Sequence, residues 1–344
     1  MPFSLSGRCY IIAEAGVNHN GNAEMARELV RAARRAGADA VKFQTFRADA
    51  LVVRDAAKAR YQLRTTDPDE SQYEMLRKLE LPRETQRELA ELCVKEGIQF
   101  LSTPYNFEDV DFLDSLGVPA FKLASIHLVE RPFLQYVARK GKTIIVSTGM
   151  GTLKDVEEAV GAIREVSQAP LILLQCTTNY PSPPEDANLR AMATMREALR
   201  LPVGYSDHTQ SPTCCVAAAA LGAVMIEKHF TLDRTLPGPD HSSAAGPEEF
   251  AQLVARIRET ERALGSGRKE PSPAEAANAP AMRRSIVAGR RIRAGEVISA
   301  EALTLKRPGT GLAPRYWDQI LGQKAPREIA PDEPLNFLLG ENAN

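Results

Sequence analysis

The sequence predicts an α/β protein, a (β/α)8 TIM barrel followed by a small β-rich domain. Eight short, mostly apolar runs alternate with segments whose apolar residues recur at helical spacing, and eight such units close a barrel. No G-x-G-x-x-G turn follows the first run, which argues against the alternative of an open, doubly wound sheet. After residue 265 this alternation gives way to a stretch rich in proline, alanine and charged residues.

The predicted strands mostly begin with continuous apolar residues, as expected for parallel strands that helices cover on both faces. Gly37 and Gly97 end helical segments where a positive φ is needed, and Thr152 or Asp155 can cap the start of another. The predicted strands are residues 10–16, 40–46, 100–105, 120–125, 143–149, 171–177, 203–208 and 224–230.

Residues 47–81 form a long insertion after the second predicted strand. Segments of this length in compact domains are usually lids or partner surfaces, and a helical decoration without contacts is the alternative. We expect residues 1–268 to form the barrel domain, residues 269–282 a linker, and residues 283–344 the β-rich domain. A unit of this size is only marginally stable alone, so we expect it to dock on another surface.

Composition and charge exclude several classes of protein. The 344 residues contain 43 Lys and Arg against 44 Asp and Glu, so no basic field is available for nucleic acid or an anionic membrane. No apolar run approaches the roughly 20 residues that span a bilayer, and we identify no signal peptide. The five cysteines include no C-x-x-C pair. We therefore expect a cytoplasmic protein with reduced, buried thiols.

All five histidines lie at or just beyond the carboxyl ends of predicted strands, where a barrel of this kind has its active site. One strand-end histidine is most often satisfied by hydrogen bonds, but five at one end of a barrel favour a shared site. His208 and His229 end the seventh and eighth strands, and Glu14 and Asp240 are predicted nearby. This set fits a divalent ion that keeps coordination positions open for a substrate.

Two lysines, Lys42 and Lys122, extend from the second and fourth predicted strands into a site otherwise lined mainly by neutral groups. We expect them to bind an anion, because neighbouring strand-end hydroxyls are donors that a phosphate or carboxylate accepts from. These hydroxyls belong to Ser125, Ser147 and Ser206. A buried lysine that forms a Schiff base with a carbonyl substrate is the alternative, as is a simple ion pair with Glu14.

Several motifs follow one another along the chain, and together they resemble the sialic acid synthases. The motifs are IIAEAGVNHNG, AVKFQTF, FLSTPY, FKLAS, VSTGM, GYSDHT, EKHFTLDRTLPGPDH and LKRPGTG. The resemblance extends from Cys9 to about Leu335. It implies condensation of phosphoenolpyruvate with an open-chain N-acylated hexosamine of the N-acetylmannosamine type. It also implies that residues 283–344 form an antifreeze-like (SAF) domain that caps the other subunit's barrel in a domain-swapped homodimer.

The resemblance also implies roles for individual residues. His208 and His229 match the ligands of Mn²⁺ or Mg²⁺, and Glu14 matches the acidic residue beside the reacting carbons. Phosphoenolpyruvate would be bound by Lys42, Thr103, Lys122, Ser125, Ser147 and Ser206. The sugar would be bound by Gln44, His127, Tyr180, Asp240 and Arg307, of which Arg307 comes from the cap.

After Ser125, many neuraminate synthases have an acidic residue two positions further on and then an asparagine, whereas this chain has SIHLVERP, with His127 and Glu130. In CTTNYP, Thr178 rather than Asn179 is a candidate for the place of the family's asparagine. The resemblance implies a carbon–carbon bond-forming transferase, and we expect an N-acetylneuraminate synthase. Legionaminate or pseudaminate synthesis from a diacetamido-trideoxyhexose is the alternative. A Schiff-base pyruvate aldolase and a non-catalytic sugar-binding protein are more distant ones.

Overall fold

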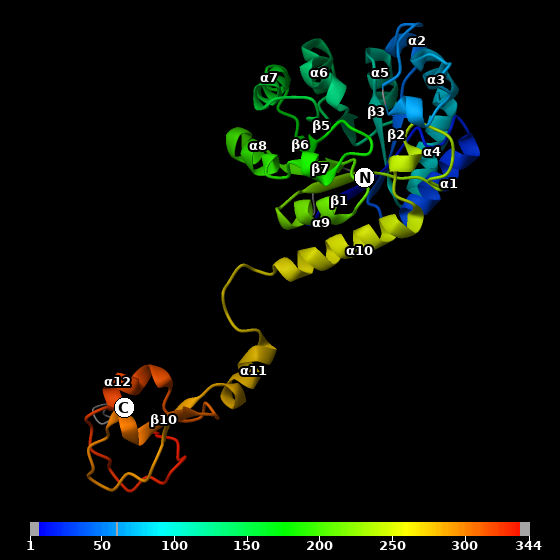
Figure 1. Cartoon of the computed structure of the whole chain (residues 1–344). Helices are drawn as coiled ribbons and strands as arrows, with labels where there is room; N and C mark the ends of the chain where they lie inside the picture. Colours follow the sequence, from blue (N-terminus) through cyan, green and yellow to red (C-terminus); the bar gives the residue numbers. More distant parts are fainter. Residues whose placement is uncertain (1–6, 60, 338–344) are drawn as a thin grey trace. The chain divides into compact units, whose positions relative to one another are not determined.

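The computed structural model describes residues 7–59 and 61–337 (Figure 1). The chain divides into two compact units, residues 1–265 and residues 266–344. Within the described residues, no helix has both the length and the apolar character that a membrane span requires. All five cysteines are free and buried.

The described part of the first unit contains an eight-stranded, all-parallel sheet in the order β3-β2-β1-β8-β7-β6-β5-β4. β3 and β4, the first and last strands in this order, contact each other, so the sheet closes into a barrel. The predicted barrel is confirmed, and each predicted strand matches an observed one to within two residues. The strands are β1 (Tyr10–Gly16), β2 (Ala40–Thr45), β3 (Gln99–Pro104), β4 (Ala120–Leu123), β5 (Thr143–Ser147), β6 (Leu171–Cys176), β7 (Val203–Asp207) and β8 (Met225–His229).

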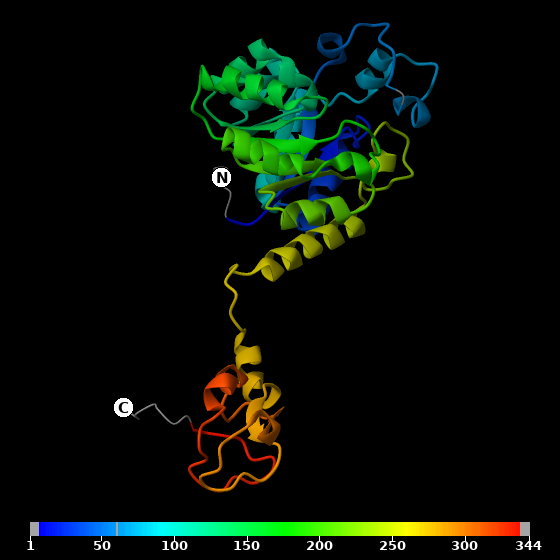
Figure 2. The same cartoon turned by 60° about the vertical axis from the view of Figure 1, so that its left-hand side comes forward.

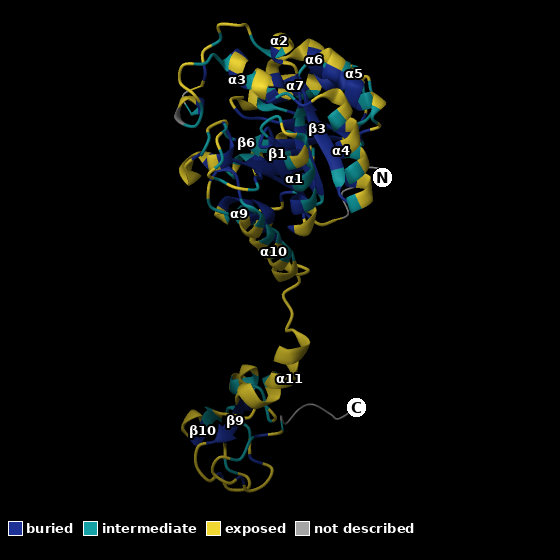
Figure 3. Ribbon diagram, turned by 90° about the vertical axis from the view of Figure 1, so that its right-hand side faces the viewer, coloured by how far each residue is buried: buried dark blue, intermediate teal, exposed yellow. Residues whose placement is uncertain are grey.

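Helices surround the barrel, with their buried faces against the strands and their exposed faces outward (Figure 3). Local sequence sets their ends: Thr152 and Asp155 form a capping box that begins α7, and Gly97 ends α4 with a φ of 69°. The helices are α1 (Ala23–Arg35), α4 (Arg83–Glu96), α5 (Phe107–Ser115), α6 (Arg131–Ala138), α7 (Leu153–Arg164), α8 (Ala191–Leu199), α9 (Thr213–Ala220) and α10 (Pro247–Leu264).

Apolar side chains fill the barrel interior toward the amino ends of the strands. This cluster comprises Ile12, Ala40, Leu101, Ala120, Ile145, Ile172, Leu174 and Met225. Because side chains alternate along a strand, polar residues two or more positions further along the same strands face the same interior at its carboxyl end. The barrel interior is therefore closed by apolar side chains at the amino ends of the strands and lined by polar side chains at their carboxyl ends.

The described part of the insertion after β2 contains α2 (Ala48–Leu51), a 3-10 helix (Gln62–Arg64) and α3 (Gln72–Lys78). Figure 2 shows it as blue-to-cyan loops and short helices at one end of the barrel. Met75 and Leu79 pack there against Val17 and Phe46 of the barrel loops. The insertion therefore contacts the barrel and is more than a detached decoration.

The second unit has a small core and one antiparallel strand pair, β9 (Ser285–Ala288) with β10 (Leu303–Lys306), which confirms the small β-rich domain. A short helix, α12 (Trp317–Ile320), packs there, and 3-10 helices span Ala300–Ala302 and Pro314–Tyr316. Ten of the fourteen residues of the predicted linker, 269–282, form a helix, α11 (Pro273–Met282). Its alanine content and the capping box of Ser272 and Glu275 favour a helix although none of its residues is buried.

Candidate active site

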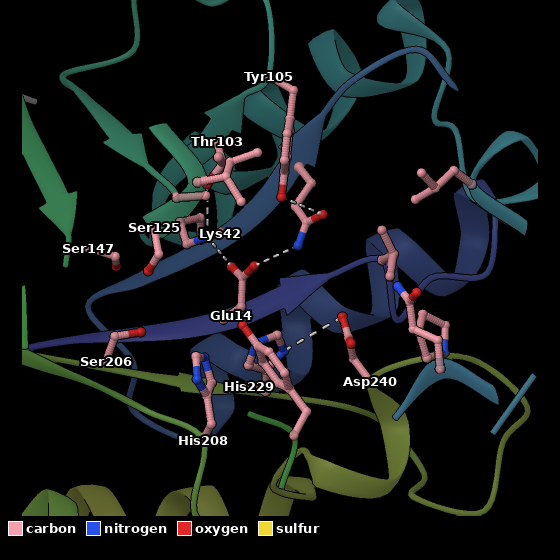
Figure 4. A pocket seen from close by; sticks show the side chains of 18 of the residues that line it. Glu14, Lys42, Thr103, Tyr105, Ser125, Ser147, Ser206, His208, His229 and Asp240 are labelled. Carbon is pink, nitrogen blue, oxygen red and sulfur yellow. Dashed lines mark hydrogen bonds and ion pairs between the residues drawn. The ribbon is translucent and has the colours of Figure 1, made fainter. Parts of the chain in front are cut away.

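A cavity of about 370 Å³ opens at the carboxyl ends of the barrel strands (Figure 4). Twelve of the fourteen predicted site residues line it. They are Glu14, Lys42, Gln44, Thr103, Lys122, Ser125, Ser147, Tyr180, Ser206, His208, His229 and Asp240. Residues from all eight strands or the loops that follow them therefore converge on one cavity.

The Lys42 ammonium contacts two other side chains that line the cavity. Its Nζ is 2.6 Å from Glu14 Oε2 and donates a hydrogen bond to Thr103 Oγ1 at 3.1 Å. All three side chains are buried. Burial raises the pKa of Glu14 to about 7, although Lys42 opposes that rise. Glu14 can therefore gain or lose a proton near neutral pH.

A second buried group surrounds Lys122. Its Nζ donates to Ser147 Oγ at 2.8 Å and lies 3.2 Å from Glu227 Oε1, which also accepts from Ser206 Oγ at 3.1 Å. Burial lowers the pKa of Lys122. Glu227 was not among the predicted site residues. Strand alternation could have found it, because Glu227 lies two positions before His229 and faces the same interior.

The turn after β5 packs against the hydroxyl of Ser125, which lines the cavity. Gly149, just after β5, lies so close to Ser125 and Thr178 that an added Cβ would be 2.7 Å from Ser125 Oγ and 2.3 Å from Thr178 Oγ1. Its backbone N–H donates to Ser125 Oγ at 3.0 Å. Gly149 therefore lies close to the hydroxyls of both Ser125 and Thr178, and the role of Thr178 stays a prediction.

His208 and His229 lie with their ring centroids 5.3 Å apart. His208 Nδ1 donates to the backbone carbonyl of Thr177 at 2.6 Å, which leaves Nε2 to face a ligand. His229 Nδ1 is buried with no hydrogen-bond partner among the described residues, and it lies 4.0 Å from Asp240 Oδ2. Burial lowers the pKa of His229 and keeps its ring neutral.

These groups fit the divalent ion that the sequence predicts. Neutral imidazoles are the usual protein ligands of such ions, and His229 has an unused buried nitrogen. Within the described residues, no three His, Cys, Asp or Glu side chains are arranged to hold a metal by themselves. Water and substrate would therefore supply the remaining ligands, as in an open catalytic site.

Aromatic rings cover the histidine pair. The Tyr180 ring lies 4.1 Å from that of His208 and meets the His229 ring edge-on at 5.6 Å. Tyr61, from the insertion, lies 4.9 Å from Tyr180. The sequence predicts Tyr180 at the site, whereas Tyr61 was missed because no local pattern connects it to Tyr180, which lies far along the chain after β6.

The insertion also forms one wall of the cavity, which we call the insertion wall. It combines apolar side chains with two carboxamides, and Gln72 Nε2 donates to Gln62 Oε1 at 3.2 Å. The wall consists of Leu51, Val52, Gln62, Gln72, Met75 and Leu76. Of the two interpretations of residues 47–81, the structure therefore supports a part in the site.

Two predicted site residues lie elsewhere. His127 packs behind Tyr105, with ring centroids 5.5 Å apart, and its Nδ1 pairs with Glu130 Oε2 at 2.8 Å. Tyr105 faces the cavity in its place and donates to Gln44 Oε1 at 3.3 Å. Arg307 is exposed in the second unit, where its Nε donates to the carbonyl of Met282 at 3.0 Å. Its contact with the sugar stays a prediction.

Comparisons with known proteins agree with this geometry. The NeuB family matches residues 29–269, and the SAF domain matches residues 283–337. The chain is 46% identical to the N,N'-diacetyllegionaminic acid synthase of Legionella pneumophila, over 94% of this chain and 92% of that protein. It is 34% identical to human N-acetylneuraminate-9-phosphate synthase, over 97% and 93% of the two chains.

A solved structure shows the same likeness. The N-acetylneuraminic acid synthetase of Leptospira borgpetersenii superposes with a TM-score of 0.70 at 32% identity, over 79% of this chain and 90% of that one.

Proposed function

Because this chain belongs to the NeuB family of sialic acid synthases, we propose that it condenses phosphoenolpyruvate with a diacetamido-trideoxyhexose to give N,N'-diacetyllegionaminic acid and phosphate. This choice replaces N-acetylneuraminate, which the sequence alone favoured, with the alternative product. The greater identity to a legionaminic acid synthase, 46% against 34% for the human neuraminate-phosphate synthase, supports the change.

The observation that carries the proposal is the insertion wall, which faces the lysines and histidines across one cavity. A trideoxy sugar presents a methyl group where a neuraminate precursor presents a hydroxymethyl group. Apolar side chains such as Met75 and Leu76 favour the methyl, since each buried methylene-sized group contributes about 0.8 kcal/mol. A hydroxyl against them would lose its hydrogen bonds to water.

The two carboxamides of the wall suit the second acetamido group. A carboxamide offers both donors and acceptors, as does an acetamido group. Gln72 already donates to Gln62, so a bound acetamido group would extend an existing amide pair. A sugar hydroxyl also donates and accepts, but it does so through one oxygen atom, whereas an acetamido group presents its donor and its acceptor on separate atoms.

Phosphoenolpyruvate would occupy the half of the cavity that contains Lys42 and Lys122. Glu14 and Glu227 now neutralise these lysines, and the anionic substrate would take their place as partner. When the Lys42 ammonium pairs with phosphoenolpyruvate instead, it no longer lowers the pKa of Glu14. Binding of phosphoenolpyruvate therefore favours the protonated form of Glu14. Glu14 would thereby take up a proton beside the reacting carbons and return it later.

Mn²⁺ or Mg²⁺ held by His208 and His229 would polarise the sugar aldehyde as a Lewis acid. The Thr177 carbonyl fixes the His208 tautomer, and Tyr180 shields the pair from water. The methylene carbon of phosphoenolpyruvate forms the new bond to the aldehyde carbon, and the aldehyde oxygen takes the π electrons and a proton to become a hydroxyl. Water adds to the cationic carbon that bears the phosphate and loses a proton. The C–O bond to phosphate then breaks, phosphate leaves with the electron pair, and the loss of the second water proton gives the ketone. Fixed lysine charges beside that phosphate stabilise the departing group.

Phosphate release tests the proposal. It should require phosphoenolpyruvate, a diacetamido-trideoxyhexose and a divalent ion together. The His208→Ala/His229→Ala variant should lose at least about 100-fold in kcat, as expected when metal ligands are removed. His241→Ala is a matched control, because His241 bonds Thr231 and Asn20 at the same barrel end without lining the cavity. Undiminished phosphate release by the double variant would contradict the metal role.

A further inference from the structure

We infer that the buried ion pair of Asp207 and Lys228 positions His208 and His229 as metal ligands, acting from the outer face of the barrel. The inference rests on the proposed function in one respect, that this histidine pair binds a divalent ion. The two charged residues do not line the cavity and touch no substrate site. They are positioning residues, and their partners lie on β7, β8 and α9.

The register of β7 and β8 places the ion pair on the outer face of the barrel wall and the two histidines on its inner face. Ser206 is paired with Glu227, and Asp207 with Lys228, across β7 and β8. Ser206 and Glu227 line the cavity, so the next pair along faces outward and the histidines that follow face inward again. Each histidine therefore comes directly after one member of the ion pair.

Asp207 fixes the backbone on one side of His208. Its Oδ1 accepts a hydrogen bond from the Thr209 backbone N–H at 2.9 Å and from Tyr205 Oη at 3.0 Å. Its Oδ2 accepts from Cys215 Sγ of α9 at 3.1 Å. The Asp207 side chain thus closes a tight turn that has His208 at its centre.

Lys228 ties this turn to β8. Its Nζ lies 2.6 Å from Asp207 Oδ2 and donates to the Thr209 carbonyl at 2.6 Å. Lys228, which precedes His229, therefore contacts Asp207 and Thr209, the residues on either side of His208. A change in this contact would alter the distance between the two imidazoles, which is the quantity that a metal site depends on.

Stability alone gives little reason for such a pair. The Asp207 and Lys228 side chains are 0% and 3% exposed, and well-packed apolar residues often replace a buried ion pair without loss of stability. The Asp207 carboxylate instead accepts four hydrogen bonds, which connect β7, the turn at His208, β8 and α9.

Mn²⁺ binding to the full-length chain tests the inference, with free Mn²⁺ followed by electron paramagnetic resonance. The Asp207→Asn/Lys228→Met double variant removes both charges and leaves neither unpaired. We expect its Kd for Mn²⁺ to rise about 10- to 100-fold, the range found for residues that orient metal ligands. If that variant does not fold, Tyr205→Phe removes one donor to Asp207 and should raise the Kd several-fold.

A second ion pair provides a matched control at the other end of the barrel. Asp39 precedes β2, accepts from the Ile11 N–H of β1 at 2.9 Å, and pairs with Arg258 at 2.9 Å. Asp39→Asn/Arg258→Met should lower the melting temperature and leave the Mn²⁺ Kd unchanged. Equal Mn²⁺ affinity in wild type and the Asp207/Lys228 double variant, or in wild type and a Tyr205→Phe protein used in its place, would overturn the inference. A wild-type chain without Mn²⁺ binding would overturn the metal role itself.

Discussion

Lys58 holds in place the segment that carries Gln62 of the insertion wall. The Lys58→Met variant therefore tests whether the insertion wall binds the sugar. The Lys58 side chain is 1% exposed, and its Nζ lies 2.9 Å from Glu70 Oε1. It also donates to Thr66 Oγ1 at 3.0 Å and to the Asp67 carbonyl at 2.5 Å. One ammonium therefore joins both ends of the segment that presents Tyr61 and Gln62 to the cavity.

The expected loss follows from these contacts. Breaking a buried ion pair costs about 3–5 kcal/mol. We expect the lower end, about 3 kcal/mol, because Glu70 keeps Lys78 as a partner. At about 1.4 kcal/mol per factor of ten, the insertion should open roughly 100-fold more often. Amide hydrogen exchange in residues 56–72 should accelerate by that factor, and KM for the sugar should rise far more than KM for phosphoenolpyruvate.

Lys78→Met is the matched control. Lys78 pairs with the same carboxylate but its side chain is 68% exposed, so its removal should leave hydrogen exchange and both KM values within about twofold. Accelerated exchange in Lys58→Met with an unchanged KM for the sugar would refute the reasoning, because the insertion would then open without affecting the sugar site.

Three further predictions concern the barrel and the cap. Arg307→Ala should raise KM for the sugar more than KM for phosphoenolpyruvate, and equal effects in steady-state kinetics would count against the swapped cap. Borohydride should trap no pyruvate adduct on Lys42 or Lys122, and mass spectrometry that finds one would favour the aldolase alternative. Because burial raises the pKa of Glu14 from 4.5 to about 7, its contribution to stability is full below pH 4.5 and is lost as the pH rises through 7. The melting temperature of Glu14→Gln should therefore fall less than that of wild type between about pH 5 and pH 8, and parallel melting curves would contradict that pKa.

The fold was largely predictable because local sequence carries the information that a barrel needs. Continuous apolar runs predicted strands such as Leu171–Cys176, and glycine and capping residues predicted helix ends such as Gly97 and Thr152. The helix Pro273–Met282 was not predicted, because a stretch rich in proline, alanine and charged residues is typical of a linker. Pro273 occupies the first turn, where proline is well tolerated.

The site was predictable where it follows from strand ends and less so where it depends on distant contacts. The conclusion that polar strand ends share one cavity needed only the barrel geometry. Whether His127 faces that cavity depends on how Tyr105 and Phe133 pack around it, and the residues next to His127 do not encode that packing. Tyr61 likewise depends on the path of a long insertion, which no local pattern specifies.

Internal competition tests the central claim most directly. Equal concentrations of N-acetylmannosamine and a diacetamido-trideoxyhexose would be incubated with limiting phosphoenolpyruvate and Mn²⁺, and the products would be measured by mass spectrometry. The product ratio equals the ratio of the two kcat/KM values. We predict that N,N'-diacetyllegionaminic acid exceeds N-acetylneuraminic acid at least about tenfold, as one well-matched polar contact provides. An excess of N-acetylneuraminic acid, or no nonulosonic acid at all, would contradict the account.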